Sequence, residues 1–174
     1  MAIIARDSGS ADFEPAPEGM HAAVCVDVVD KGMVEGTWGQ SHKVQIRWQL
    51  DGHNSDAGFR NDGKPWLVVR QFTLSLHDKA ALRKFLTSWR GKAFTPEELQ
   101  GFDVEKVMGA PCLLQIIHNA RPDGKVFANV ENVMPLPKGF AKPVASDYVR
   151  VIDRGPADGL PPEEDAGDDH MPDW

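Results

Sequence analysis

Hydrophobic and polar residues alternate most regularly over residues 42–50 (HKVQIRWQL). One side of this segment is apolar, and the other carries Lys43, Gln45, Arg47 and Gln49. A period of two is typical of a half-buried β-strand. Runs rich in β-branched residues predict four more strands, at 20–30, 66–75, 112–118 and 126–133. The glycine-rich stretch 31–41 and the polar stretch 51–65 are predicted as loops.

The period of the pattern changes in the middle of the chain. Over 76–91, Leu82, Phe85, Leu86 and Trp89 recur at helical spacing, and Gly91 follows as a stop signal. A second, short helix is predicted at 95–99, because its first residues form a capping box with a proline in the first turn. One further turn is expected within 102–109, and an Asp-Gly pair after the fourth strand predicts a hairpin.

The resulting order is β-β-β-α-β-β, which predicts a mainly β fold: a five-stranded OB-fold Greek-key barrel with a helical insert between strands three and four. We expect this domain at 19–138, after a flexible N-terminal arm at 1–18. A linker follows at 139–152. Within and just beyond it, residues 147–153 alternate, which predicts either a small extra strand or a docking segment. Residues 153–174 have the composition of a disordered acidic tail.

The net charge of −7 is concentrated in that tail. From residue 153 onward, eight acids accompany one base, whereas residues 19–152 carry 17 bases and 14 acids, a net charge of +3. A mildly basic body with an acidic tail indicates a nucleic-acid partner or an interaction tail. The chain has no 18-residue apolar run, so we expect no membrane partner, and its two cysteines suit buried thiols in a cytoplasmic protein.

The sequence lacks the motifs of nucleophilic, phosphate-binding and metal-dependent enzymes, so we expect neither catalysis nor a cofactor or metal. It does contain aromatic residues close to cations, the combination that binds single-stranded nucleic acid by base stacking and phosphate contacts. In an OB barrel such residues are expected on strands two and three and on the 1–2 and 4–5 loops. The candidate nucleic-acid-binding residues are Trp38, Lys43, Arg47, Phe59, Arg60, Lys64, Trp66, Arg70, Lys125 and Phe127.

Several candidates also have a structural alternative. Trp38 could fold back over the barrel end, the 51–66 residues could form a lid on the barrel, and Lys43 and Arg47 could belong to a merely solvated face. Phe127 is expected to point outward, because Val126, Ala128 and Val130 are predicted to make the inward face of the last strand.

The C-terminal residues suit a binding role better than a structural one, because a terminal Trp in an acidic tail buries nothing in its own fold. The tail residues concerned are Asp168, Asp169, Met171, Pro172, Asp173 and Trp174. Acids followed by an apolar residue, proline and an aromatic resemble the tail of bacterial and phage single-stranded DNA-binding proteins. This tip departs from theirs in the inserted Asp173 and in ending on Trp instead of Phe.

The body, "FTLSLHDKAALRKFLTSWRGKAFTPEEL…GFDVEKVMGAPCLLQIIHN" (72–119) followed by "GKVFANV" (124–130), is similar to phage proteins of this type that accompany replication and recombination genes. This resemblance covers roughly residues 20–138. The resemblance implies a cytoplasmic protein of an infected or lysogenic bacterium. It implies coating of single-stranded DNA during replication, recombination and repair, with partner enzymes recruited through the tail. Strand edges at 20–30 and 112–118 could pair two copies as a homodimer. The alternative is a protein-interaction module, a DNA mimic or an inhibitor of a host DNA-processing enzyme, that binds no DNA.

Overall fold

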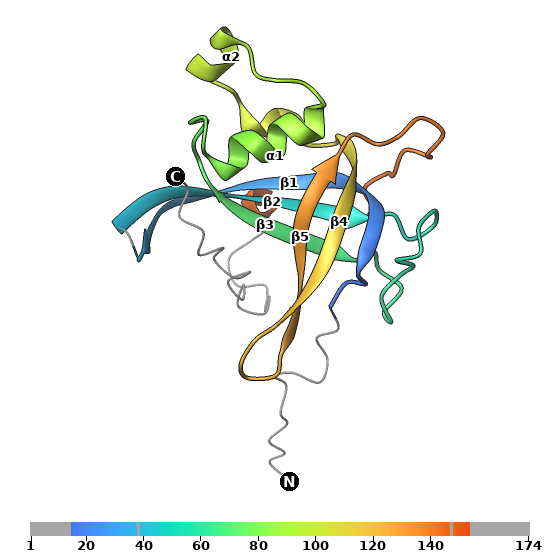
Figure 1. Cartoon of the computed structure of the whole chain (residues 1–174). Coiled ribbons are helices and arrows are strands. Elements are labelled where there is room, and N and C mark those ends of the chain that lie inside the picture. Colours follow the sequence, from blue (N-terminus) through green and yellow to red (C-terminus); the bar gives the residue numbers. More distant parts are fainter. Residues whose placement is uncertain (1–14, 38, 147, 154–174) are drawn as a thin grey trace.

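The computed structural model describes residues 15–37, 39–146 and 148–153 (Figure 1). Five antiparallel strands form one curved sheet, and the helical elements between the third and fourth strands lie over one end of it. The elements, in chain order, are β1 (Gly19–Gly36), β2 (Gly39–Leu50), β3 (Leu67–Thr73), α1 (Ala81–Arg90), α2 (Pro96–Gln100), the 3-10 turn η1 (Val104–Val107), β4 (Pro111–Ala120), β5 (Val126–Met134) and the 3-10 turn η2 (Val151–Asp153).

The strands lie in the order β3-β2-β1-β4-β5, which confirms the predicted mainly β fold with the strand order of an OB Greek key. Strand β1 is central and pairs with both β2 and β4. Among the described residues no ladder joins the outer strands β3 and β5. Instead Arg70 of β3 donates from Nη1 to the carbonyl oxygens of Val130, at 3.1 Å, and Glu131, at 3.2 Å, in β5.

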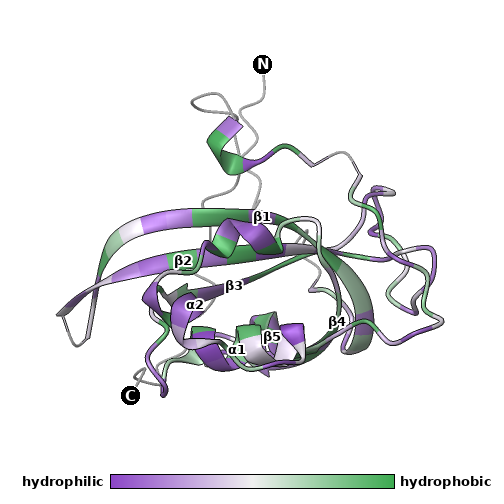
Figure 2. Ribbon diagram, turned by 90° about the horizontal axis from the view of Figure 1, so that it is seen from above, coloured by the Kyte–Doolittle hydropathy of each residue, from purple (hydrophilic) through white to green (hydrophobic). Residues whose placement is uncertain are grey.

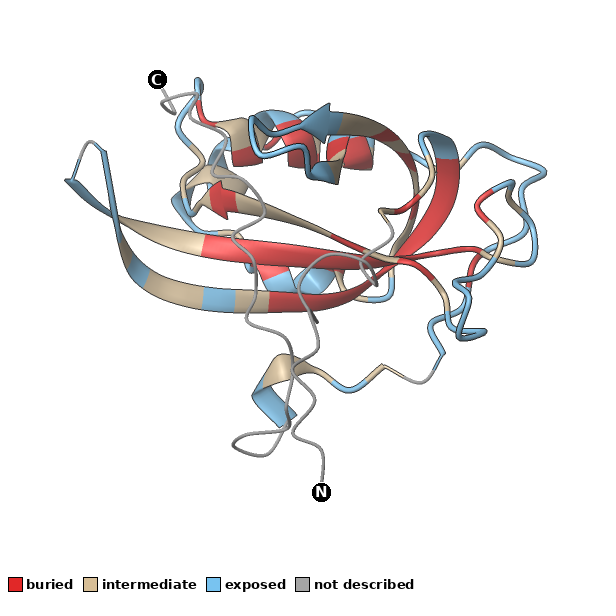
Figure 3. Cartoon of the chain, turned by 90° about the horizontal axis from the view of Figure 1, so that it is seen from below, coloured by how far each residue is buried: buried red, intermediate tan, exposed pale blue. Residues whose placement is uncertain are grey.

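Strands β1 and β2 continue into a long hairpin, so the predicted loop at 31–41 is wrong. Pairing runs without interruption in the ladder from Gly32 with Lys43 to the turn at Gly36 and Gly39. The glycines that suggest a loop serve a bulge and a turn: Gly32 has a φ of 67° at a register shift, where its N–H donates to the Asp30 carboxylate at 2.8 Å. Figure 3 shows that burial ends before the tip of this hairpin.

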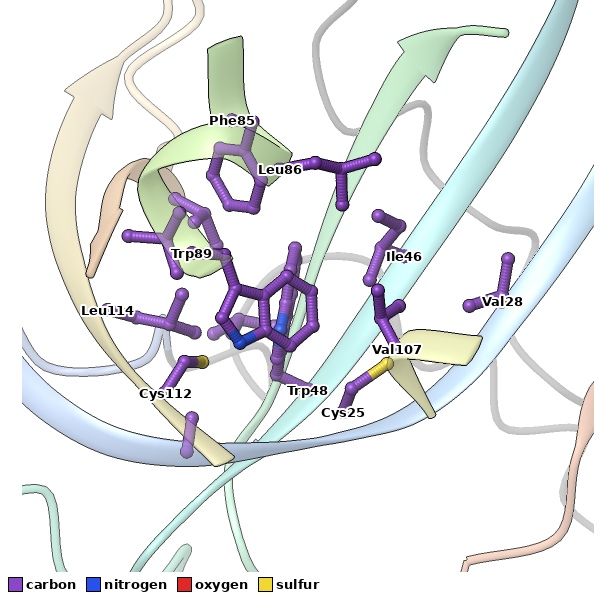
Figure 4. Close-up of a cluster of buried hydrophobic side chains, with 14 of the residues drawn as sticks. Cys25, Val28, Ile46, Trp48, Phe85, Leu86, Trp89, Val107, Cys112 and Leu114 are labelled. Atoms are coloured by element: carbon purple, nitrogen blue, oxygen red, sulfur yellow. The ribbon is translucent and has the colours of Figure 1, made fainter. Parts of the chain in front are cut away.

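The core lies between the inner face of the sheet and helix α1. Trp48 of β2 is fully buried, and its ring centroid lies 5.6 Å from that of Phe85 and 5.8 Å from that of Trp89, both on α1. Figure 4 shows these rings above Cys25 and Cys112, whose thiols are buried as predicted. Burial raises the pKa of the Cys25 thiol to about 12, so both cysteines behave as small apolar residues.

The helical insert follows the sequence pattern closely. Helix α1 buries Leu82, Phe85, Leu86 and Trp89, as predicted, and ends at Gly91, whose φ is 70°. Helix α2 has the predicted capping box: Thr95 accepts from the Glu98 N–H, and the Glu98 carboxylate accepts from the Thr95 N–H. A Cβ at residue 91 would lie 3.2 Å from the ring of Pro135, so the chain after β5 passes close to the end of α1.

The C-terminal segment packs on the outer face of the sheet. Figures 2 and 3 show the turn η2 on the side of β1 and β2 opposite α1. Residues 148–153 contain the turn η2 instead of the predicted alternative of a small strand, and their contacts are those of a docking segment. Ser146 exchanges two hydrogen bonds with the Gln49 side chain, at 2.8 and 2.9 Å.

Asp27 is the anchor of this segment. A register shift between Cys25 and Asp27 turns its carboxylate, 1% exposed, toward the segment. It accepts hydrogen bonds from the Tyr148 hydroxyl (2.9 Å), the Arg150 Nε (3.2 Å) and the Val151 N–H (2.9 Å). Burial alone would raise the pKa of Asp27, but these donors outweigh burial and lower it below its usual value.

We predict that Asp27→Asn lowers the free energy of unfolding by about 1–3 kcal/mol at pH 7, because buried donors lose a charged acceptor. A lowered pKa stabilises the fold above the pKa of the unfolded chain, about 3.9, and this stabilisation is lost as the pH falls below it. The difference between wild type and variant should therefore shrink from pH 5 to pH 3 in urea unfolding followed by circular dichroism. The exposed Asp56→Asn is the control. A difference that does not change with pH would contradict the assignment.

Candidate nucleic-acid interface

The outer face of β2 is open only near the β1–β2 hairpin. Lys43 is half-buried, and its Nζ donates to the Thr73 hydroxyl of β3 at 2.7 Å. The prediction of an accessible Arg47 is wrong, because only 5% of Arg47 is exposed and its Nε and Nη2 donate to Gln45 at 2.9 and 2.6 Å. The C-terminal segment lies along this part of the face, so Lys43 is the cation of β2 that remains accessible.

The β4–β5 hairpin carries an aromatic ring with cations around it. The predicted Asp-Gly turn forms: the Gly124 N–H donates to the Arg121 carbonyl at 2.9 Å, and Gly124 has a φ of 88°. Phe127 is half-buried near the turn, and the Arg121 guanidinium lies 4.0 Å from the centroid of its ring. Lys125 is exposed beside them. Val126, predicted inward, is 39% exposed because the hairpin extends beyond the core.

The 51–66 loop is packed on itself. Trp66 is only 7% exposed and its Nε1 donates to the Ala57 carbonyl at 3.1 Å, so the prediction of Trp66 as a stacking residue is wrong. Phe59 is 39% exposed, but its ring packs against Gly52 and makes an edge contact with His53. A Cβ at residue 52 would lie 2.7 Å from that ring, so only glycine fits there.

The cations of this loop lie away from the hairpins. Arg60 pairs with Asp62 at 3.2 Å, and Lys64 is exposed. Figures 1 and 2 show the 51–66 loop and the β1–β2 hairpin at opposite ends of the sheet. The structure therefore does not gather all the predicted residues into one clamp.

Arg70, predicted to contact a phosphate, makes contacts within the domain itself. Its guanidinium lies 4.8 Å from the ring centroid of Phe72 and 5.1 Å from that of Phe85, between the outer strands β3 and β5. With its hydrogen bonds to the β5 backbone, Arg70 joins the two outer strands where no ladder does. Because Arg70 holds β5 beside β3, the outer surface continues from β2 across β3 to β5.

The candidate interface is thus the open part of this surface together with the β4–β5 hairpin: Lys43, Thr73, Arg121, Lys125 and Phe127. Thr73 and Arg121 are not among the residues predicted from the sequence. The turn "NARPDGK" contains a signal for Arg121, because hairpin pairing places the two residues that flank a short turn opposite each other. These residues are Arg121 and Lys125, and Lys125 is two residues from Phe127. The Thr73 contact depends on the register between β2 and β3, in which Lys43 faces Thr73.

Trp38 and the six predicted tail residues, Asp168, Asp169, Met171, Pro172, Asp173 and Trp174, lie outside the described residues. Among residues 15–37, 39–146 and 148–153, no group of three or more His, Cys, Asp or Glu side chains is arranged to hold a metal ion. No helix in the described part of the chain is long and apolar enough to cross a membrane. No known family model matches the chain, and no curated protein matches it significantly.

We predict that Arg70→Ala lowers the free energy of unfolding by about 2–3 kcal/mol, because it removes charge-assisted hydrogen bonds and ring contacts from a half-buried position. Arg60→Ala, which breaks an exposed ion pair, should cost less than about 1 kcal/mol. Guanidinium unfolding of both variants and the wild type measures the difference. Equal losses for the two variants would contradict the role of Arg70 in closing the sheet.

Proposed function

We propose that this protein binds single-stranded DNA along the outer surface of β2, β3 and β5 and the β4–β5 hairpin. The observation that carries the proposal is the Phe127 ring with the Arg121 guanidinium at 4.0 Å and Lys125 beside it, on the 4–5 loop of a sheet with OB strand order. Every nucleobase has a face that stacks on an aromatic ring, and each nucleotide adds a phosphate for a cation. Such a site binds without a strong preference for sequence.

The remaining interface residues suit the DNA backbone. Lys43 and Thr73 present an ammonium group and a hydroxyl on neighbouring strands, 2.7 Å apart. Both groups can donate hydrogen bonds to a phosphate, and neither reads a base edge. In the proposal these groups hold the backbone while the hairpin stacks a base. In the proposal the activity serves replication and recombination and the tail recruits partner enzymes, a role that the resemblance of the sequence to phage single-stranded DNA-binding proteins supports.

Three of the five tryptophans are poor fluorescence probes of this binding. Trp48, Trp66 and Trp89 are at most 7% exposed, so their emission would report little of a ligand on the outer surface. The anisotropy of a fluorescently labelled oligo-dT, titrated with the full chain, measures binding directly. The same experiment with labelled duplex DNA tests the preference for single strands.

We predict that Phe127→Ala raises the Kd for oligo-dT roughly 5- to 150-fold, the loss expected when one stacking contact of about 1–3 kcal/mol is removed. Phe140→Ala is the control, because Phe140 is an accessible phenylalanine (49% exposed) with lysines two residues away on each side, but it lies at α1 and η1. Thermal unfolding of both variants checks that the fold persists. Binding that Phe127→Ala leaves unchanged, or that Phe140→Ala weakens equally, would place the site elsewhere. No binding of oligo-dT at low salt would contradict the function.

A further inference from the structure

A second feature of the surface lies away from the candidate interface and does not depend on nucleic-acid binding. An open pocket of about 660 Å³ lies between α1, η1 and the chain after β5. Its apolar lining includes Phe102 and Phe140, and its four cationic residues are Arg90, Lys106, Lys138 and Lys142. An apolar surface surrounded by cations suits a ligand that combines apolar groups with carboxylates.

Three of the four cations of the pocket are poorly neutralised by their surroundings in the described part of the chain, whereas the fourth, Arg90, is partly neutralised. Arg90 pairs with Glu98 at 2.7 Å, yet its buried Nη1 has no hydrogen-bond partner among the described residues. None of Lys106, Lys138 and Lys142 forms an ion pair with another residue of the described part of the chain. The pocket therefore keeps a positive charge that an acidic segment would complement.

Phe140 is the apolar centre of this surface. It is 49% exposed between Lys138 and Lys142, in the sequence "KGFAK", and the pocket wall beside it is formed by prolines and Leu136. An exposed aromatic ring in a concave, apolar surface is typical of a binding site. Covering this ring would contribute to binding through the hydrophobic effect, in addition to the ionic contacts at the lysines.

The chain itself supplies a segment of matching chemistry. After Asp153, the sequence has seven further acids against one base and ends in Met-Pro-Asp-Trp. Arg150, three residues before the last described residue, reaches toward η1: its Nη2 lies 3.9 Å from the Glu105 carboxylate, and Lys106 of the pocket follows Glu105 directly. The 21 residues from 154 to 174 can span up to about 70 Å, more than the diameter of about 40 Å of a domain this size.

We propose that the pocket lined by Arg90, Lys106, Lys138, Lys142, Phe102 and Phe140 is an intramolecular docking site for the chain's own C-terminal residues 163–174. In this arrangement the carboxylates of the tail lie at the three lysines, and Met171 and Trp174 cover Phe140. The covalent connection gives the tail an effective concentration in the millimolar range, so even a weak contact is occupied. The occupied pocket then holds the tail on the side of the domain away from the hairpins.

Paramagnetic broadening in the full-length protein tests this proposal. Ala166→Cys introduces a site for a nitroxide in the tail and leaves the final acids and Trp174 intact. The native cysteines do not compete for the label, because Cys25 and Cys112 are at most 1% exposed and burial keeps their thiols protonated. At low salt, the amide signals of Lys106, Lys138 and Phe140 should lose intensity by about twofold or more, as expected for a tethered contact. The intensity should partly recover at high salt, where screening is stronger.

Two double variants that reverse the charge of lysines, one pair inside the pocket and one pair outside it, test the site. Lys138→Glu combined with Lys142→Glu should abolish the broadening, whereas Lys79→Glu combined with Lys84→Glu, the same change at two exposed lysines outside the pocket, should leave it unchanged. Broadening that survives the first pair, or that appears mainly on the β1–β2 and β4–β5 hairpins, would overturn the proposal.

Two further results would assign the pocket to another ligand and also overturn the proposal. In a mixture of spin-labelled unenriched protein and unlabelled ¹⁵N protein, broadening at Phe140 would show that the tail of a second copy binds there. Broadening of the same amides by a spin-labelled oligo-dT would assign the pocket to nucleic acid. If only the tail fails to dock, the single-stranded DNA-binding proposal for the opposite surface is unaffected.

Discussion

The whole architecture depends on one long strand that has to pair with two neighbours. Residues 19–24 of β1 bond to β4, while residues 23–36 bond to β2. Strand β1 meets this constraint by bending at a bulge between Cys25 and Asp27. The freed backbone of Cys25 bonds to Gly109 and Ala110, which fixes the end of η1. The Asp27 carboxylate, on the other side, holds the C-terminal segment, so one irregularity positions elements on both faces of the sheet.

Two surfaces of different character result from this arrangement. The outer face of β1 and β2 is partly covered by the segment around Tyr148 and Arg150, which leaves only the end near Lys43 open. The β4–β5 hairpin extends beyond the covered region and presents Phe127 and Arg121. The pocket at α1 and η1 lies on the other side, where Figure 2 shows the helical insert. In the account proposed here, DNA binds to the first surface and the acidic tail to the second, so neither ligand excludes the other.

The sequence predicted the strands, the helices and their order because each rests on a local pattern. Alternation marks β2, helical spacing marks α1, and the capping box marks α2. Accessibility could not be predicted in the same way. Arg47 and Trp66 are buried by contacts that depend on the tertiary fold, and the segment beside Arg47 bonds to Gln49 across 97 residues of sequence. The loop predicted at 31–41 failed for a local reason, since glycines in a bulge and a hairpin turn look like glycines in a loop.

The most direct test of single-strand binding at the β4–β5 hairpin is an amide chemical-shift map of the ¹⁵N-labelled full-length protein during titration with oligo-dT. If the protein binds single-stranded DNA at this hairpin, the largest shifts occur at Lys43 and Thr73 and along residues 120–127. These shifts grow with DNA concentration and are reversed by salt. The 51–66 loop and the pocket around Phe140 should change little. Shifts confined to that loop or that pocket, or no shifts at low salt, would contradict the account.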